Sequence, residues 1–175
     1  MPGSVTSVFS EADEFEAALR KEGCLGLLII GRGQFRARLT QITLHRLRLS
    51  SGEEQLSRIA VVAAPHDLVL ISFPIGPAPS PIWNGVRFRA GEIMIIGPGQ
   101  RVYARTDGPC RWGAIWLSVE ELIRYGHAVT GAPFDIPSVA RCWRPPPVAR
   151  GHLGQLHAAA VRIAARCEAR PVPLC

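Results

Sequence analysis

Residues 92–117 read EIMIIGPGQRVYARTDGPCRWGAIWL, and this stretch decides the fold class. It contains three runs that are rich in apolar and β-branched residues, at Glu92–Ile96, Arg101–Thr106 and Arg111–Leu117. A Gly-Pro-Gly segment and a Gly-Pro dipeptide separate the runs, and both are typical of turns. Short strands that alternate with tight turns indicate antiparallel β-structure rather than a parallel sheet with intervening helices.

The same pattern extends towards the N-terminus. Further strands are predicted at Leu25–Ile30, Phe35–Leu44, Leu44–Leu49, Ile59–Ala63, Leu68–Ile75 and Val86–Arg89. The segments Gly31-Arg32-Gly33 and Gly97-Pro98-Gly99 lack the strand-turn-helix context of a phosphate-binding loop, so we interpret both as hairpin turns. About seven to nine short strands with turns between them predict an antiparallel barrel or sandwich.

Helices are predicted both before and after the strands along the sequence. The first lies between Ser10, whose side chain can cap it, and Gly23, which can end it. A capping box at residues 118–121 begins a second helix, which Gly131 can end. After a Pro-rich connection, the spacing of apolar residues predicts a long helix over Val148–Cys167.

The composition is that of one folded domain of 175 residues and 19.0 kDa, with 47% hydrophobic and 19% charged residues. Its uncharged apolar stretches are shorter than the roughly 20 residues that cross a bilayer, and the acidic N-terminus is unlike a signal peptide. We therefore expect a cytoplasmic protein without a membrane partner. The net charge is +6, but nearly all basic residues are scattered arginines, which favours a compositional bias over a nucleic-acid surface.

The sequence contains few of the patterns that catalysis or metal binding requires. The five cysteines form no C-x-x-C motif, and the five histidines form no H-x-H or H-x-x-x-H motif. The adjacent carboxylates Glu53-Glu54 fall in a predicted turn, and there is no G-x-S-x-G nucleophile motif. The residues therefore predict no catalytic group, no metal site and no cofactor.

Apolar and aromatic side chains on the strands remain as candidates for a binding site. Alternation places Trp112 with Trp116 on one face of a strand, and His45 with Leu47 on one face of another. These residues fit either a packed core or the wall of a pocket for one apolar ligand, which His45 or Tyr103 would orient. The candidate ligand-binding residues are Phe35, His45, Phe73, Phe88, Tyr103, Trp112 and Trp116.

The long C-terminal helix is a candidate dimer interface, because its apolar residues recur at spacings of three and four. The same stripe can instead pack on the β-domain of its own chain, and one helix can serve both contacts. The candidate dimerisation residues are Leu153, Leu156, His157, Ala160, Ile163 and Ala164.

Several short motifs occur in an order that resembles the N-terminal domain of AraC-type bacterial transcription regulators. The motifs are Trp83-Asn84-Gly85, Gly91-Glu92-Ile93, Pro98-Gly99, Arg105, Trp112-Gly113-x-Ile115, Leu117-Ser118 and Glu121-Leu122. The resemblance begins near Phe9 and reaches Arg144-Pro145 and the helix around Leu156, so it covers nearly the whole chain.

The resemblance implies a mainly β fold with C-terminal helices: a cupin-like antiparallel β-barrel of the jelly-roll type followed by a helical dimerisation region. Residues 1–117 would form the first helix and the barrel, and residues 118–175 the helical region packed on it as one compact unit. The implied function is effector sensing and homodimerisation, with a small apolar or aromatic effector in the barrel. DNA would be bound only through a C-terminal helix-turn-helix domain, which does not follow Cys175 in this chain.

Two alternatives remain open from the sequence. One is a small metal-dependent cupin enzyme, an isomerase or an oxygenase. The turn from Gly91 to Gly99 resembles that of metal-binding cupins, but Val102 and Tyr103 stand where a further ligand histidine would follow. The other alternative is a stand-alone interaction module that pairs with full-length regulators.

Overall fold

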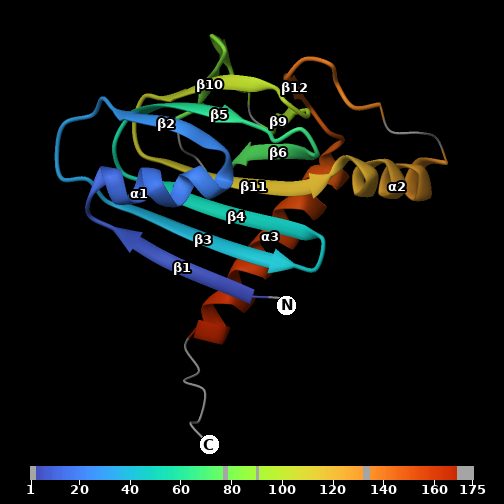
Figure 1. Ribbon diagram of the computed structural model, residues 1–175, viewed down its shortest axis with the longest axis horizontal. Helices are drawn as coiled ribbons and strands as arrows, with labels where there is room; N and C mark the ends of the chain where they lie inside the picture. Colours follow the sequence, from blue (N-terminus) through green and yellow to red (C-terminus); the bar gives the residue numbers. More distant parts are fainter. Residues whose placement is uncertain (1–2, 77–78, 90, 132–134, 169–175) are drawn as a thin grey trace, which may run out of the picture.

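The computed structural model describes residues 3–76, 79–89, 91–131 and 135–168 and shows two antiparallel β-sheets with helices packed on them (Figure 1). The larger sheet has seven strands in the order β1-β3-β4-β11-β6-β9-β12, and the smaller has five in the order β2-β5-β10-β7-β8. The strands are β1 (Gly3–Phe9), β2 (Cys24–Ile29), β3 (Ala37–Leu44), β4 (Leu47–Glu54), β5 (Arg58–Ala63), β6 (Leu68–Pro74), β7 (Ile82–Trp83), β8 (Val86–Arg87), β9 (Ile93–Ile96), β10 (Arg101–Thr106), β11 (Cys110–Ser118) and β12 (Arg141–Trp143). Every described strand pair is antiparallel, which confirms the predicted mainly antiparallel β-structure.

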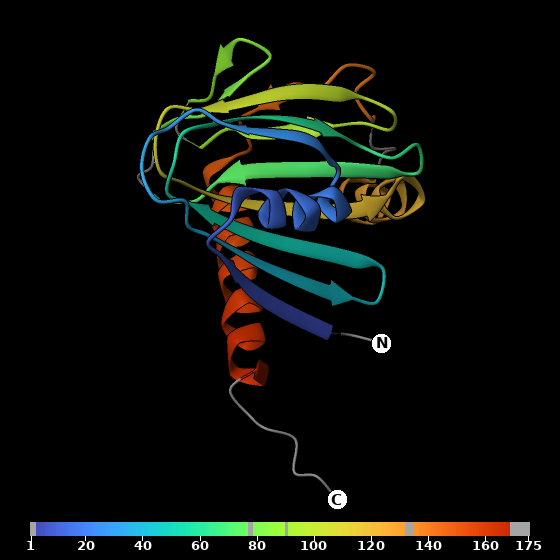
Figure 2. The same ribbon diagram turned by 60° about the vertical axis from the view of Figure 1, so that its left-hand side comes forward.

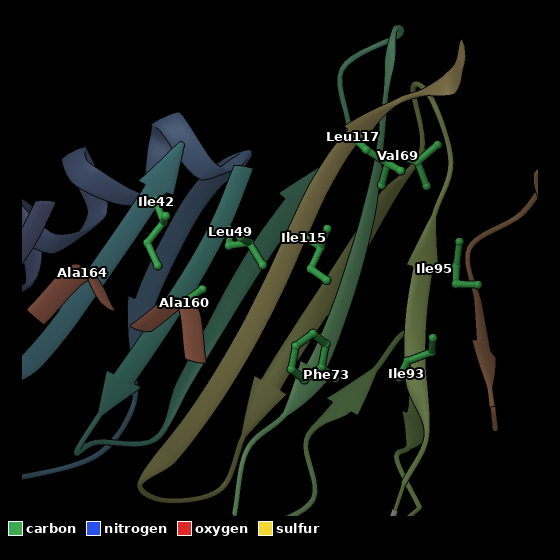
Figure 3. Packing of buried hydrophobic residues seen from close by; sticks show 10 residues of the cluster. All are labelled: Ile42, Leu49, Val69, Phe73, Ile93, Ile95, Ile115, Leu117, Ala160 and Ala164. Atoms are coloured by element: carbon green, nitrogen blue, oxygen red, sulfur yellow. The ribbon is translucent and has the colours of Figure 1, made fainter. Parts of the chain in front are cut away.

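Side-chain alternation on the central strand β11 gives the larger sheet two buried faces. Ala114 and Trp116 belong to a core that includes residues of the smaller sheet, whereas Ile115 and Leu117 belong to a core on the opposite face. Figure 3 shows this second core along the larger sheet, with alanines of the C-terminal helix closing it. The molecule is therefore layered as helix, larger sheet and smaller sheet.

Strand β1 is an element that we did not predict. It pairs along its whole length with β3 at one edge of the larger sheet. Because β1 continues to Phe9, helix α1 (Ala12–Leu19) begins only after Glu11, whose side chain makes no capping hydrogen bond. The expectation that Ser10 caps this helix is therefore wrong.

The end of this first helical segment agrees with the sequence. A 3-10 turn, η1 (Arg20–Glu22), follows α1 and ends at Gly23, where φ is 74°. Helix α1 lies across one side of the two sheets, as the views in Figures 1 and 2 agree. Its buried residues Phe15 and Leu19 join a core with β3 and β5.

Two glycine segments that we interpreted as hairpin turns instead carry the chain from one sheet to the other. Gly31-Arg32-Gly33 lies between β2 in the smaller sheet and β3 in the larger, and Gly97-Pro98-Gly99 lies between β9 in the larger sheet and β10 in the smaller. Glycine and proline indicate that the chain changes direction. They do not specify the next pairing, which depends on how both sheets bury their apolar faces.

Two tight turns join neighbouring strands. Leu44 pairs with Leu47, so a two-residue turn at His45-Arg46 separates β3 from β4. His45 has a φ of 51° and is exposed in this turn, which corrects its expected place on a strand face. Asn84-Gly85 forms the predicted turn between β7 and β8.

The second predicted helix has the expected ends. Ser118 Oγ accepts a hydrogen bond from the backbone amide of Glu121 over 3.1 Å at the start of α2 (Val119–Thr130). Gly131 follows the helix with a φ of 71°.

The predicted long helix is α3 (Pro147–Glu168), which packs on the larger sheet (Figure 2). Strand β12, which pairs with β9, was not predicted because it lies in the Pro-rich connection. Among the described residues, no helix is long and apolar enough to span a membrane. The division of the chain at residue 117 stays a prediction.

Candidate functional site: a cavity between the sheets

A cavity of about 70 Å³ lies between the two sheets. Most of its wall is apolar and comes from both sheets and from the end of α1. The apolar wall residues include Leu19, Ala60, Val62, Leu70, Phe73, Trp83, Phe88, Ala104, Trp112 and Ala114. Exposed Pro79 and Arg111 also line the cavity, so they mark where it meets solvent.

Arg58, a polar residue of the wall, belongs to a buried ion pair with Glu54, which lies outside the cavity lining. Arg58 at the start of β5 is 8% exposed, and Glu54 at the end of β4 is 1% exposed. Arg58 Nε donates a hydrogen bond to Glu54 Oε2, and Trp112 Nε1 donates to Glu54 Oε1 over 2.7 Å. Burial, the largest single effect, lowers the pKa of Arg58, but the charge and hydrogen bond of Glu54 together with the nearby Cys110 and Cys24 outweigh it, and the net shift is upward. The guanidinium is therefore charged at any physiological pH.

Trp112 can reach Glu54 because the facing strand carries a glycine. Trp112 on β11 pairs with Gly52 on β4. A Cβ atom on Gly52 would lie only 2.1 to 2.5 Å from atoms of the indole ring. The absence of a side chain at this position therefore allows the indole to lie flat over the neighbouring strand.

Glu22 of η1 is a buried carboxylate that does line the cavity. It accepts hydrogen bonds from Gln41 Nε2 over 2.7 Å, from Trp116 Nε1 over 3.0 Å and from Ser50 Oγ. These three donors belong to β3, β11 and β4, so Glu22 ties the end of the first helical segment to the larger sheet.

The thiols of Cys24 and Cys110 also line the cavity. Burial, followed by the nearby charge of Glu54, raises the pKa of Cys110 to about 12. Burial also raises the pKa of Cys24. Both thiols are therefore protonated and weakly nucleophilic at neutral pH.

The structure brings only some of the predicted ligand-binding residues together. Phe73, Phe88 and Trp112 line the cavity. Phe35 is buried beside α1, and Trp116 is buried in the core between the sheets.

The two polar candidates lie elsewhere. Tyr103 is 56% exposed, and its backbone amide donates to Asn84 Oδ1. His45 is exposed in its turn. Neither lines the cavity, because strand alternation directs Tyr103 outwards and because His45 is not in a strand.

Sequence reasoning missed the polar groups in the wall and next to it. Glu54 was placed in a turn, but it ends strand β4 and points inwards. Glu22 and Arg58 lie in no recognisable motif. Their role depends on the meeting of two sheets and a helical turn, for which a single sequence contains no signal.

The candidate dimerisation residues are divided between two faces of α3. His157, Ala160 and Ala164 are buried against the larger sheet, and Leu153 packs against the same core. Leu156 and Ile163 are 52% and 61% exposed. Part of the apolar stripe therefore packs on the larger sheet of the same chain. The side chains of Leu156 and Ile163 remain available to a partner chain.

His157 is fixed between the helix and the cavity wall. Its Nε2 lies 3.0 Å from the backbone oxygen of Ser50, and its ring meets the ring of Phe73 edge-on at 5.2 Å between centroids. Because the partner is a carbonyl oxygen, Nε2 must carry the proton in this contact. Among the residues that the structure describes, no three His, Cys, Asp or Glu side chains form a group able to hold a metal ion.

No family model matches this sequence, and no curated protein matches it. Among solved structures, similar chains include the EutQ protein of Clostridium difficile, with a TM-score of 0.39 and 12% identity over 65% of this chain and 95% of that one. A predicted oxalate decarboxylase from Thermotoga maritima has a TM-score of 0.38 and 11% identity over 54% of this chain and 91% of that one. A cupin 2 domain-containing protein from Halorhodospira halophila has a TM-score of 0.33 and 12% identity over 90% and 94%. Similarities of this size carry no argument about function.

Proposed function

We propose that this chain is the effector-sensing and dimerisation domain of a cytoplasmic AraC-type transcription regulator, with a cupin-like jelly-roll fold. The observation that carries the proposal is the cavity between the sheets, whose wall is mainly apolar and aromatic with a few buried polar groups. Such a composition is typical of sites for small organic ligands. The order of sequence motifs and the long C-terminal helix support the same function.

The geometry suggests how a ligand would affect the helix. Phe73 is one of the residues that line the cavity, and its ring contacts His157 of α3. A ligand that contacts Phe73 therefore acts one residue away from the helix. If one arrangement of α3 in a dimer binds the ligand better, the ligand shifts the population towards that arrangement and so controls a DNA-binding domain joined to it.

No observation on the described part of the chain favours the metal-dependent enzyme. Metal analysis of the purified protein tests it directly: stoichiometric iron, manganese or zinc would support the enzyme. The stand-alone interaction module shares the sensor domain's cavity and helix, and it differs only in its partners.

Ligand screening by thermal shift tests the proposed function. We expect small apolar or aromatic compounds to raise the melting temperature of the wild-type protein. Ala104→Leu fills the cavity from β10, so this variant should fold and lose the response. Ala158→Leu on the exposed side of α3 is the matched control and should keep it. A set of small aromatic compounds that never stabilises the wild type, or that stabilises Ala104→Leu equally, would contradict ligand binding in this cavity.

A further inference from the structure

Strand β1 is the longest outer edge of either sheet in the described part of the chain. Its seven residues, Gly3–Phe9, pair with β3 along one side. Among the described residues, no strand pairs with its other side. Because the backbone groups of a strand alternate in direction, about half of the N–H and C=O groups of β1 point away from the sheet.

The composition of β1 does not protect this edge. Natural edge strands are usually short, covered, irregular, or interrupted by a charged residue or a proline, and these features prevent unwanted pairing. Residues 3–9 read Gly-Ser-Val-Thr-Ser-Val-Phe and contain neither a charge nor a proline. Val5 and Val8 are 58% and 69% exposed. A long, uncharged and regularly paired edge of this kind can accept a further strand.

The other three sheet edges differ from β1 in these features. Strand β12 has three residues and begins with exposed Arg141, and β8 has two residues and ends with exposed Arg87. Strand β2 is longer, but α1 packs beside it, and its pairing with β5 is irregular between Cys24 and Gly26. The contrast singles out β1 as the edge that is left open to a partner.

A second copy of this chain fits the open edge. Antiparallel pairing of β1 with its own copy follows a twofold axis and uses both open edges, so the assembly closes at two chains, whereas a head-to-tail contact would continue into a filament. Because β1 is uncharged, the paired strands meet without repulsion between like charges. The acidic first turn of α1, with Asp13 and Glu14, follows the Phe9 end of β1. Antiparallel pairing places these two acidic turns at opposite ends of the contact.

We propose that this chain forms a homodimer by antiparallel pairing of β1 with β1 of a second copy, which joins the two larger sheets into one continuous sheet. The inference rests on the proposed dimerisation function and adds a second surface to it. The twofold axis of such a pair is perpendicular to the sheet, so both α3 helices lie on the same face of the joined sheet. Helix α3 packs against β1, and its C-terminal end extends past this strand (Figures 1 and 2). The arrangement therefore meets the condition for a contact between exposed α3 residues such as Ile163.

Lysine substitutions on the edge strand test the proposal in the full chain. Val5→Lys/Val8→Lys introduces the charges that protect natural edges, at two side chains that are exposed in the single chain. The matched control is Val86→Lys/Val139→Lys, which adds the same charge at a valine of edge strand β8 and at an exposed valine outside the strands. We expect the dissociation constant of the dimer to rise about tenfold or more in the first variant, as for the loss of a buried valine, and to stay unchanged in the control. Sedimentation equilibrium measures the constant, and circular dichroism confirms the fold.

Hydrogen exchange in the wild type keeps the proposal testable if the first variant does not fold. The amides of β1 that point away from β3 exchange rapidly in a single chain and slowly when they pair with a second strand. Their protection should therefore be present in the dimer at tens of micromolar and should be lost when dilution dissociates it.

The outcomes separate this inference from the proposed function. If the wild type is dimeric but these amides exchange rapidly, or if the folded lysine variant dimerises as tightly as the control, the inference is wrong while dimerisation through α3 stands. If the amides are equally protected in dimer and monomer, another part of the same chain covers the edge, and the inference is again wrong. If the wild type is monomeric at tens of micromolar, the proposed dimerisation function itself fails.

Discussion

At the scale of single residues, Gly52 and Trp112 show how one missing side chain creates a polar contact. The indole lies over the position that a Cβ of Gly52 would occupy and thereby reaches Glu54. Glu54 in turn holds Arg58 in the cavity wall. The glycine therefore acts on the candidate site through two intermediate side chains.

Gly52→Ala should destabilise the protein. The new methyl group would force the indole away from β4 and weaken its hydrogen bond to Glu54, and overpacking of this kind costs about 1–3 kcal/mol. Urea unfolding followed by tryptophan fluorescence measures the change. Gly26→Ala is the matched control, because a Cβ at Gly26 in β2 would meet nothing within 4 Å. Equal stability of Gly52→Ala and the wild type would contradict the packing described for Trp112.

Residue types alone predicted part of the cavity wall. Phe73, Phe88 and Trp112 were candidates because aromatic residues on strands alternate in and out, and these three do line the cavity. Glu54 and Arg58 escaped notice because a charged residue is normally expected at the surface. Their burial becomes understandable only when β4, β5 and β11 are brought together in space.

At the scale of elements, an ion-pair cluster ties helix α2 to the larger sheet. Glu121 in the first turn of α2 accepts hydrogen bonds from Arg46 in the β3–β4 turn over 2.6 Å and from Arg124. The capping box is thus only half formed, because the backbone amide of Glu121 is capped while its carboxylate is used for these two arginines. The hydrogen bond from Arg46 is the main reason why the pKa of Glu121 is lowered to about 2.

The lowered pKa predicts a specific pH dependence of stability. A carboxyl group whose pKa falls on folding, here from 4.5 to about 2, stabilises the folded state fully above its unfolded pKa and loses this contribution as the pH falls towards its folded pKa. The free energy of unfolding of Glu121→Gln should therefore lie below that of the wild type at about pH 6, and the gap should shrink as the pH falls through about 4 to 2. Urea titrations over this range measure it. Glu120→Gln, on the exposed neighbour, should show no such gap, and a gap for Glu121→Gln that does not depend on pH would contradict the role of its charge.

The residues that end the helical segments were predicted better than the strands that pair with one another. Gly23 and Gly131 end helical segments as expected, because a positive φ at the residue after a helix is a local property of glycine. Gly31-Arg32-Gly33 was assigned to a hairpin, although the strands on its two sides belong to different sheets. Pairing is a long-range property, and local turn chemistry cannot encode it.

At the scale of the whole molecule, α3 is the element that can connect the cavity to a partner chain. One face of the helix buries His157, Ala160 and Ala164 against the larger sheet. Another face leaves Leu156 and Ile163 largely exposed. These two residues are seven positions apart, so they lie on the same side of the helix, two turns from each other. A second copy of this chain that covers this side would complete the apolar stripe.

Leu156→Arg should therefore convert a dimer into a folded monomer. Leu156 is 52% exposed in the single chain, so the substitution does not disturb the core, but in a dimer it would place an unpaired charge in the contact and remove a side chain whose burial contributes about 2 kcal/mol. Light scattering after gel filtration, at protein concentrations of tens of micromolar, measures the mass, and circular dichroism confirms the fold. Val139→Arg is the matched control: Val139 is 71% exposed and lies outside α3, so this variant should remain dimeric. A monomeric wild type, or a Leu156→Arg variant that stays dimeric, would show that α3 only covers its own sheet.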